Sequence, residues 1–273
     1  MQRTFITEAP ASLYVEIGTG AVQVHAGGAG PTEVRVEGRD ADEVTVEERG
    51  EQIVVIGPQR RGGFFGFGGD LTVTVHAPVG SDLATKLGSA DLTTTGTLGA
   101  VHLKSGSGEI RSETVTAEAT VLSGSGGIEI GEALGELRVK TGSGNVRIGR
   151  ASGSAVISSG SGRVEIRSSE GSAAAKTGSG DVIIGSANGD VSMTSGSGDL
   201  EVGSIASGVV RVKTASGDVA VVIPAGTPVW TDISCLTASV RSSLESAGPP
   251  QDGQAHVEVR ATTVSGDVVL THP

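Results

Sequence analysis

Ser105-Gly-Ser-Gly108 is the first complete copy of the four-residue phrase that decides how this chain folds. The phrase returns at every eighteenth position, at Ser123, Thr141, Ser159, Thr177 and Ser195. A degenerate copy begins at Leu87, 18 residues before Ser105, and another at Thr214, 19 residues after Ser195. An internal period of about 20 residues is typical of stacked-repeat architectures, in which each repeat packs only on its neighbours.

The phrase is followed in each period by an alternating apolar pattern. Counted from the first residue of the phrase, the sixth position is apolar in every copy, from Leu92 to Val219. The eighth is apolar from Ile130 onward and the seventh is mostly polar, which predicts a strand with one inward face. A second alternating segment follows, as at Leu137 and Val139. The sequence therefore predicts an all-β fold: a single elongated parallel β-solenoid with 18-residue coils, two strands per coil and β caps at both ends.

Two features of the phrase are expected to serve the corners between strands. A coil that reverses direction within a few residues needs positive φ, which Gly adopts without a Cβ clash. The Ser at the third position occurs in all eight copies, from Ser89 to Ser216. We expect its hydroxyl to form hydrogen bonds along the stack or to backbone groups of the corner.

Charged residues repeat in the same register. The seventh position carries charges of alternating sign in four successive copies: Arg111, Glu129, Arg147 and Glu165. A parallel stack would place each charge about 4.8 Å from an opposite one. On the second strand a column of lysines skips every other coil after its second member, which avoids contacts between like charges. This column consists of Lys86, Lys104, Lys140, Lys176 and Lys213.

The repeats divide the chain into three parts. Residues 1–80 lack the phrase and read as short strands between Gly- and Pro-containing turns, which favours antiparallel or irregular β structure and an N-terminal β-strand cap region. Residues 81–223 hold the β-solenoid repeats. Residues 224–273 break the period at Pro224 and Pro228 and end in an echo of the phrase, Ser265-Gly-Asp-Val268. We expect them to form a C-terminal β cap, with Trp230 covering the last coil, because open sheet edges recruit other chains.

Composition narrows the range of partners and compartments. The net charge of −11 argues against a nucleic-acid partner, which needs clustered Lys and Arg. Cys235 is the only cysteine, so no internal disulfide is expected, as is usual in a reducing compartment. The start, MQRTFITEAP, lacks the apolar core of a signal peptide, and no apolar run of about 18 residues occurs. We therefore expect a cytoplasmic protein without a transmembrane segment.

Several segments carry a family resemblance: Thr177-Gly-Ser-Gly-Asp-Val182, the strand that ends in Ile223-Pro-Ala-Gly226, and the terminal Ser265-Gly-Asp-Val268. Together they resemble the bacterial "putative adhesin" family of β-strand-repeat proteins, a domain of unknown function. The resemblance covers roughly residues 70–273. It implies a β-solenoid fold, and it brings no catalytic residues.

The sequence predicts no catalytic, metal or cofactor site. Calcium-binding β-rolls need a carboxylate in turn after turn. Here the residue after the phrase is Gly127 or Arg163 in two copies, although Asp181, Asp199 and Asp218 could attract a cation. No G-x-G-x-x-G, P-loop or G-x-S-x-G motif occurs, and the five histidines show no metal-ligand spacing. We expect neither enzymatic activity nor a cofactor.

One local cluster stands out between two predicted strands. It consists of Phe64, Phe65 and Phe67, with Arg60 and Arg61 beside them. The loop either folds back over the first coil as a plug or forms an exposed apolar tip, because contiguous exposed apolar residues mark contact sites. We take it as the candidate interaction site for a protein partner or a second copy, and a membrane surface is the less favoured partner.

The leading hypothesis is a non-catalytic scaffold or protein-interaction module that self-associates end to end or through the aromatic loop. The alternative is an extracellular adhesin or a carbohydrate-binding or carbohydrate-processing solenoid, although the outward faces lack the aromatic platforms that bind sugars. An ice- or mineral-binding face built from Ser and Thr ladders is disfavoured, because these small side chains lie at corners rather than on a flat face.

Overall fold

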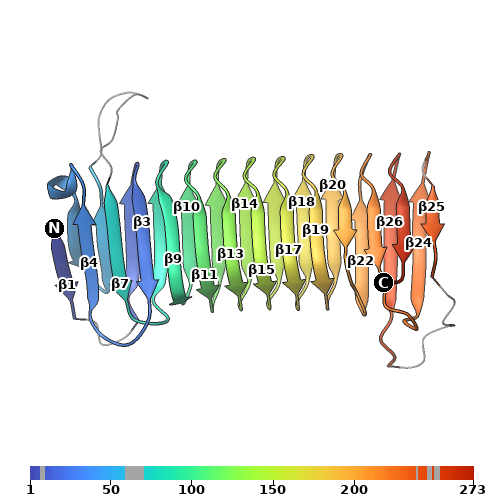
Figure 1. The fold of residues 1–273 in the computed structure, drawn as a ribbon, viewed down its shortest axis with the longest axis horizontal. Helices are drawn as coiled ribbons and strands as arrows, with labels where there is room; N and C mark the ends of the chain where they lie inside the picture. Colours follow the sequence, from blue (N-terminus) through green and yellow to red (C-terminus); the bar gives the residue numbers. More distant parts are fainter. Residues whose placement is uncertain (7–9, 59–70, 238, 245–247, 249–252) are drawn as a thin grey trace. The chain divides into compact units, whose positions relative to one another are not determined.

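The computed structural model describes residues 1–6, 10–58, 71–237, 239–244, 248 and 253–273. The chain divides into two compact units, residues 1–136 and residues 137–273. Within the described residues the secondary structure is β-strand, apart from the 3₁₀ turn η1 (Ala41–Glu43) (Figure 1). Each coil gives one strand to each of two sheets, so a unit consists of two sheets with the core between them.

In the first unit the two sheets have the orders β1-β4-β7-β3-β9-β11-β13 and β5-β6-β2-β8-β10-β12. The strands are β1 (Gln2–Phe5), β2 (Ser12–Ile17), β3 (Ala21–Ala26), β4 (Thr32–Glu37), β5 (Thr45–Arg49), β6 (Gln52–Ile56), β7 (Thr72–Ala77), β8 (Asp82–Leu87), β9 (Asp91–Leu98), β10 (Val101–Ser105), β11 (Ile110–Val115), β12 (Ala119–Ser123) and β13 (Ile128–Ala133).

In the second unit the orders are β15-β17-β19-β21-β23-β27-β25 and β14-β16-β18-β20-β22-β26-β24. The strands are β14 (Leu137–Thr141), β15 (Val146–Ala151), β16 (Ala155–Ser159), β17 (Val164–Ser169), β18 (Ala173–Thr177), β19 (Val182–Ala187), β20 (Val191–Ser195), β21 (Leu200–Val202), β22 (Gly208–Lys213), β23 (Val219–Val222), β24 (Val229–Cys235), β25 (Val240–Ser242), β26 (Val257–Thr263) and β27 (Val268–Thr271).

The repeats wind as a parallel β-solenoid, as the sequence predicts. Residues one period apart lie opposite each other, for example Ile110 and Ile128 in β11 and β13, and Val164 and Val182 in β17 and β19. The apolar positions of both strands are buried, and they form the core. Where Ser112 interrupts the apolar column, Thr94 of the neighbouring coil donates a hydrogen bond to it over 2.8 Å, so the buried hydroxyls satisfy each other.

The charged column confirms the register within each unit. Arg111 lies opposite Glu129, with Nε 3.7 Å from Oε2, and Arg147 lies opposite Glu165, with the same atoms 3.9 Å apart. These side chains are about half exposed. Each pair therefore adds little to stability, typically less than about 1 kcal/mol.

In the N-terminal part of the chain the coils do not stack in the order in which they occur in the sequence. β2 and β3 lie between the coil formed by β6 and β7 and the coil formed by β8 and β9. All of these pairings are parallel, so the expectation of antiparallel or irregular structure in residues 1–80 is wrong for β2 and β3. It is confirmed for β1, β4 and β5, whose pairings are antiparallel.

The same exchange occurs in residues 224–273. β26 and β27 stack on β22 and β23, while β24 and β25, which come earlier in the chain, lie beyond them. The echo of the phrase is a stacked copy, because the N–H of Asp267 donates to Oδ1 of Asp218 over 2.8 Å. Trp230 does not cover a coil: it lies on β24, 54% exposed, with the Arg260 guanidinium 5.6 Å from its ring centroid. The cap roles of residues 1–80 and 224–273 remain predictions.

The glycines of the phrase serve a purpose other than the expected one. Among the described residues the positive-φ glycines lie outside the complete copies of the phrase. A Cβ on Gly126 would lie 2.0 Å from the carbonyl oxygen of Gly108, and one on Gly198 would lie 2.0 Å from that of Gly180. The phrase needs glycine because the backbone of the preceding coil occupies the space of a side chain.

The hydroxyl that organises the corner stands at the first position of the phrase rather than the third. This Ser or Thr is buried and bonds to the Gly at the fourth position: Thr177 Oγ1 accepts the N–H of Gly180 over 2.7 Å, and Ser123 Oγ donates to the carbonyl of Gly126 over 2.8 Å. The third-position serines are exposed, and one pair, Ser107 and Ser89, forms a hydrogen bond along the stack.

Candidate interaction surfaces

The candidate loop containing Arg60, Arg61, Phe64, Phe65 and Phe67 lies outside the described residues. Whether it forms a plug or an exposed tip therefore stays a prediction.

In several coils the residue after the phrase carries a side-chain oxygen, mostly that of an Asp, that bonds to the next coil. Asp91 Oδ1 accepts the backbone N–H of Glu109 over 2.8 Å, and Asp199 Oδ1 accepts that of Asp218 over 2.7 Å. Asn145 does the same for Arg163 over 3.0 Å. Each side chain thus ties its corner to the next coil, which gives Asp and Asn a structural use after Gly-Ser-Gly.

This acceptor row contains the carboxylates that a calcium site between the coils would need. Asp181, Asp199 and Asp218 do lie on successive coils, but each offers one oxygen to a backbone donor of the following coil. Within the described ranges no group of three or more His, Cys, Asp or Glu side chains is arranged to hold a metal ion. The hydrogen bonds themselves show these carboxylates acting as acceptors for the corner backbone of the next coil.

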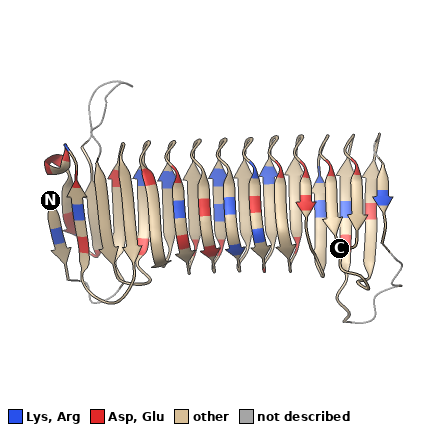
Figure 2. Cartoon of the chain, in the orientation of Figure 1, with Lys and Arg blue, Asp and Glu red and all other residues tan. Residues whose placement is uncertain are grey.

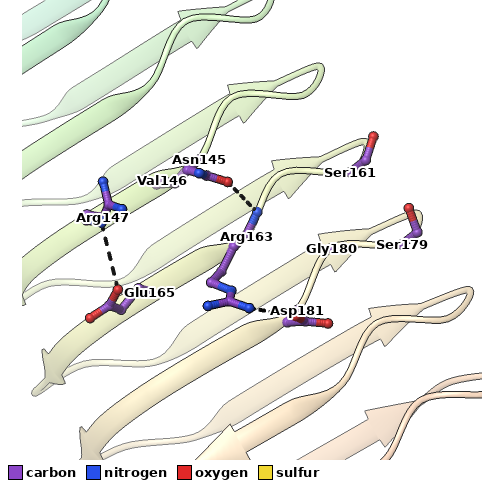
Figure 3. Close-up of a pocket in the computed structure, with 9 residues that line it drawn as sticks. All are labelled: Asn145, Val146, Arg147, Ser161, Arg163, Glu165, Ser179, Gly180 and Asp181. Atoms are coloured by element: carbon purple, nitrogen blue, oxygen red, sulfur yellow. Dashed lines mark hydrogen bonds and ion pairs between the residues drawn. The ribbon is translucent and has the colours of Figure 1, made fainter.

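Arg163 interrupts the acceptor row and lines a shallow groove of about 390 Å³ over β15, β17 and β19 (Figure 3). Its guanidinium extends toward Asp181, with Nη2 3.4 Å from Oδ2. Arg147 and Glu165 form a second, looser pair in the groove, and Ser161 lies at its rim. Because Arg carries a planar fork of donors, this groove can accept a carboxylate or another oxygen-rich group.

A polar cluster on β2 and β8 joins three ionisable side chains. The Tyr14 hydroxyl donates to Glu16 Oε2 over 2.6 Å, and Lys86 Nζ lies 2.7 Å from Glu16 Oε1. The hydrogen bond to the Glu16 carboxylate raises the pKa of Tyr14 from 10.0 to about 12. Lys86 first and Tyr14 second hold the pKa of Glu16 below its ordinary value. The cluster lies on a regular outward face and braces neighbouring coils.

Two histidines meet that are far apart in the sequence. His25 and His76 lie opposite each other on β3 and β7, with ring centroids 4.8 Å apart and nearly parallel rings. His25 Nδ1 is 2.8 Å from Thr95 Oγ1 of the adjacent coil. Sequence spacing could not reveal this pair, because it depends on the exchanged order of coils.

The described residues include no helix that could span a bilayer.

The fold defines a class: a parallel β-solenoid of short repeats whose outward side chains form rows. Across residues 12–271 the chain matches the model of the Toastrack DUF4097 family, and it belongs to that family. No curated protein matches the chain.

Three solved structures show similarity at low sequence identity. A putative adhesin from Bacteroides fragilis is 13% identical, over 100% of this chain and 97% of that one, with a TM-score of 0.36. A putative lipid binding protein from Parabacteroides distasonis is 11% identical, over 98% and 96%, with a TM-score of 0.36. A putative cell adhesion protein from Clostridium sporogenes is 10% identical, over 100% and 99%, with a TM-score of 0.25.

Proposed function

We propose that the protein is a non-catalytic scaffold or interaction module of the cytoplasm, which binds protein partners and associates with a second copy. One observation carries the proposal. The polar groups at the corners, such as Thr177 and Asp199, are bonded to backbone of their own or the next coil, whereas the outward rows are exposed in register. An array of that kind is suited to contact over an extended surface.

Self-association is expected at the sheet edges formed by β24 and β25. Among the described residues each pairs with one strand only, and a further strand can pair with its other side. The inward-facing side chains of β24 and β25 are more exposed than their partners on β26 and β27. On β24, Ile233 is half-buried, whereas Ala261 opposite it on β26 is buried. On β25, Val240 is 49% exposed, whereas Val268 opposite it on β27 is fully buried.

The free edges of the first unit are of a different kind. β1 and β5 pair antiparallel, and β5 carries Glu47, Glu48 and Arg49, with an ion pair of 2.5 Å between Arg49 and Glu47. Charged residues on an edge strand discourage further pairing. The edges at β24 and β25 can therefore accept a further strand, whereas the charges on β5 oppose it. Association should stop at a dimer in which the β24 and β25 edges of two copies meet.

Sedimentation velocity over a range of concentrations tests this proposal. We expect a monomer–dimer equilibrium that Ile233→Lys shifts to monomer, because a charge on the inward face cannot be buried between two copies. Ser234→Lys is the matched control: it adds the same charge to the same strand, on the outward face opposite Thr262, and should leave the equilibrium unchanged. A monomer at all concentrations, or equal effects of the two variants, would contradict the proposal.

The cytoplasmic location is supported by cysteine usage alone, since Cys235 leaves no internal disulfide. Fractionation of cells that produce the protein tests it. We expect recovery inside the cell, and recovery in the medium or on the outer surface would refute this part of the proposal.

The groove at Arg163 supports a second candidate function, the binding of an oxygen-rich ligand such as a glycan by an extracellular adhesin. Asn145, Ser161 and Asp181 place further donors and acceptors around the guanidinium. Screening immobilised glycans against the protein and Arg163→Ala tests it. Glycan binding that the variant loses would support this function, and the absence of glycan binding by the parent would dismiss it.

A further inference from the structure

The outward face of the second sheet of residues 137–273 carries a row in which lysines alternate with hydroxyls. Its members lie opposite one another on β14, β16, β18, β20, β22 and β26. In order they are Lys140, Ser158, Lys176, Thr194, Lys213 and Thr262. We call this set the lysine row.

A second row runs parallel to it, two positions earlier on each strand and therefore on the same face. Its members are Arg138, Val156, Ala174, Ser192, Arg211 and Arg260. The strands β14, β16, β18, β20 and β22 contain no Asp or Glu. The acidic residues on this face, Glu258 on β26 and Asp232 on β24, lie at one end of it.

This concentration of cations contrasts with the charge of the chain. The net charge is −11, and residues 137–273 contain 11 Lys and Arg against 12 Asp and Glu. Six of those 11 basic residues lie on this one face. Lys140, Lys176 and Lys213 form no ion pair with the described residues, unlike Lys86, which lies against Glu16. The blue positions on the strands of this unit in Figure 2 mark its Lys and Arg residues.

The spacing of the lysine row leaves room for an anion between successive cations. Two coils separate neighbouring lysines, so their backbones are roughly 10 Å apart. A shallow groove of about 420 Å³ lies between the first two, lined by Lys140, Ser158, Lys176 and Thr194. An ammonium group on each side and a hydroxyl donor in the middle suit a phosphate oxygen. In the second row, Ala174 and Ser192 have short side chains, so they do not prevent a partner from approaching the lysine row.

An exposed tryptophan lies at one end of the same face. Trp230 is opposite Glu258 and outward-facing, beneath Arg260. It is 54% exposed, and it is the only tryptophan of the chain. Arg260 is itself paired with Glu258, with Nε 2.5 Å from Oε1, so it is the exposed ring that indicates an interface: Trp is enriched at membrane interfaces, where it lies among the headgroups.

We propose that this face docks on an anionic phospholipid bilayer, with headgroup phosphates between the cations of the lysine row and Trp230 in the interface. The face repeats its charges in register over six strands, and fluid headgroups can move sideways to match that fixed spacing. A folded partner protein would have to carry matching acidic groups at the same interval. A nucleic acid carries phosphates at a spacing fixed by its own backbone, so it cannot adjust to the interval of the lysine row as fluid headgroups can. The proposal does not depend on self-association through β24 and β25.

Flotation with lipid vesicles and the fluorescence of Trp230 test the proposal. We expect the protein to bind vesicles that contain phosphatidylglycerol and not vesicles of phosphatidylcholine alone. Binding should weaken as salt screens the charges, and it should shift the Trp230 emission to shorter wavelength. Replacing Lys140, Lys176 and Lys213 by Gln should weaken binding on the order of 100-fold, since each cation near an anionic surface contributes appreciably.

The matched control removes three other cations from the same unit. Arg147, Arg163 and Arg241 lie outside this face, and each is ion-paired with an acidic residue. Their replacement by Gln changes the net charge equally and should leave vesicle binding within about twofold. Circular dichroism confirms that both variants are folded.

Three outcomes would overturn the proposal: no binding to phosphatidylglycerol vesicles, equal loss in both triple variants, or equal binding to uncharged vesicles. Binding of a short RNA or DNA duplex through the lysine row, without vesicle binding, would reassign the face to a nucleic acid. Because Ile233→Lys affects only the dimer, failure of vesicle binding is distinguishable from failure of self-association.

Discussion

Replacing Gly126 by Ala should destabilise the first unit far more than a surface glycine substitution ordinarily does. The added Cβ would lie 2.0 Å from the carbonyl oxygen of Gly108 and 2.8 Å from that of Ser107, and both atoms belong to backbone. Real Cβ atoms essentially never approach closer than 3.0 Å, so the corner must open by about 1 Å. A flexible side chain could turn aside, but stacked backbone cannot.

The magnitude follows from the bonds that such an opening would strain. The N–H of Ser125 donates to Gly106 over 3.0 Å, and the hydroxyl of Ser123 donates to Gly126 over 2.8 Å. Weakening these two bonds costs about 1 kcal/mol each, and overpacking adds about 2 kcal/mol. We therefore expect a loss of about 4 kcal/mol in the free energy of unfolding.

Urea unfolding followed by circular dichroism measures the loss, and amide hydrogen exchange shows whether it is centred on the corner. Gly27→Ala is the matched control, because no atom lies within 4 Å of its Cβ position and its φ is not positive. That variant should change stability by less than about 1 kcal/mol, in either direction. Equal stabilities of the two variants would refute the explanation of the glycines by close backbone contact.

Two further predictions concern polar groups of the coils. Thr177→Val should cost about 1–3 kcal/mol in urea unfolding, because the N–H of Gly180 loses its buried acceptor, whereas Ser179→Ala on the exposed third position should be nearly neutral. Tyr14, the only tyrosine, should ionise near pH 12 in an absorbance titration, and Glu16→Gln should return its pKa toward 10.0. Because the pKa of Tyr14 is higher in the folded than in the unfolded state, its hydrogen bond to Glu16 stabilises the fold below pH 10, and this stabilisation is lost as the pH rises through about 12. An unchanged Tyr14 pKa in the Glu16→Gln variant would contradict the coupling.

The sequence was sufficient to predict the winding of the repeats, because the same physical requirement recurs in every coil. An inward position such as Ile110 must stay apolar each time, and a one-residue slip would expose the whole column. The pair of Arg111 and Glu129 follows from the same register. Because the same pattern recurs in every repeat, each repeat is a separate indication of the same strand register.

The order of coils outside the repeats was beyond sequence reasoning. β2 and β3 pair with strands that follow them much later in the chain, and no phrase marks those partners. The stacking of His25 on His76 is a consequence of this pairing. Non-local strand pairings of this kind depend on which surfaces are buried together in the folded protein, and the alternation of apolar and polar residues along one strand does not identify its partner strand.

Sequence alone predicts only part of the corner chemistry, for a related reason. Glycine in a turn suggests positive φ, but Gly198 is required by the carbonyl of Gly180 in the neighbouring coil. Likewise Thr177 and Ser179 are equally regular in sequence, and only the structure shows that the first is buried and bonded. The acceptor role of Asp199 could have been inferred, because a side-chain oxygen that repeats at each corner is well placed to receive the next N–H.

Cross-linking tests in-register winding, on which both the fold and the lysine row depend, most directly. In a Cys235→Ala background, cysteines at positions 140 and 158 lie opposite each other on β14 and β16, about 4.8 Å apart and within disulfide range. Cysteines at positions 140 and 156 share the face but are offset by two positions along the strand, which places them beyond about 7 Å. We predict complete oxidation of the first pair with the fold intact and little of the second; equal oxidation of the two pairs, or a preference for the offset pair, would contradict in-register winding.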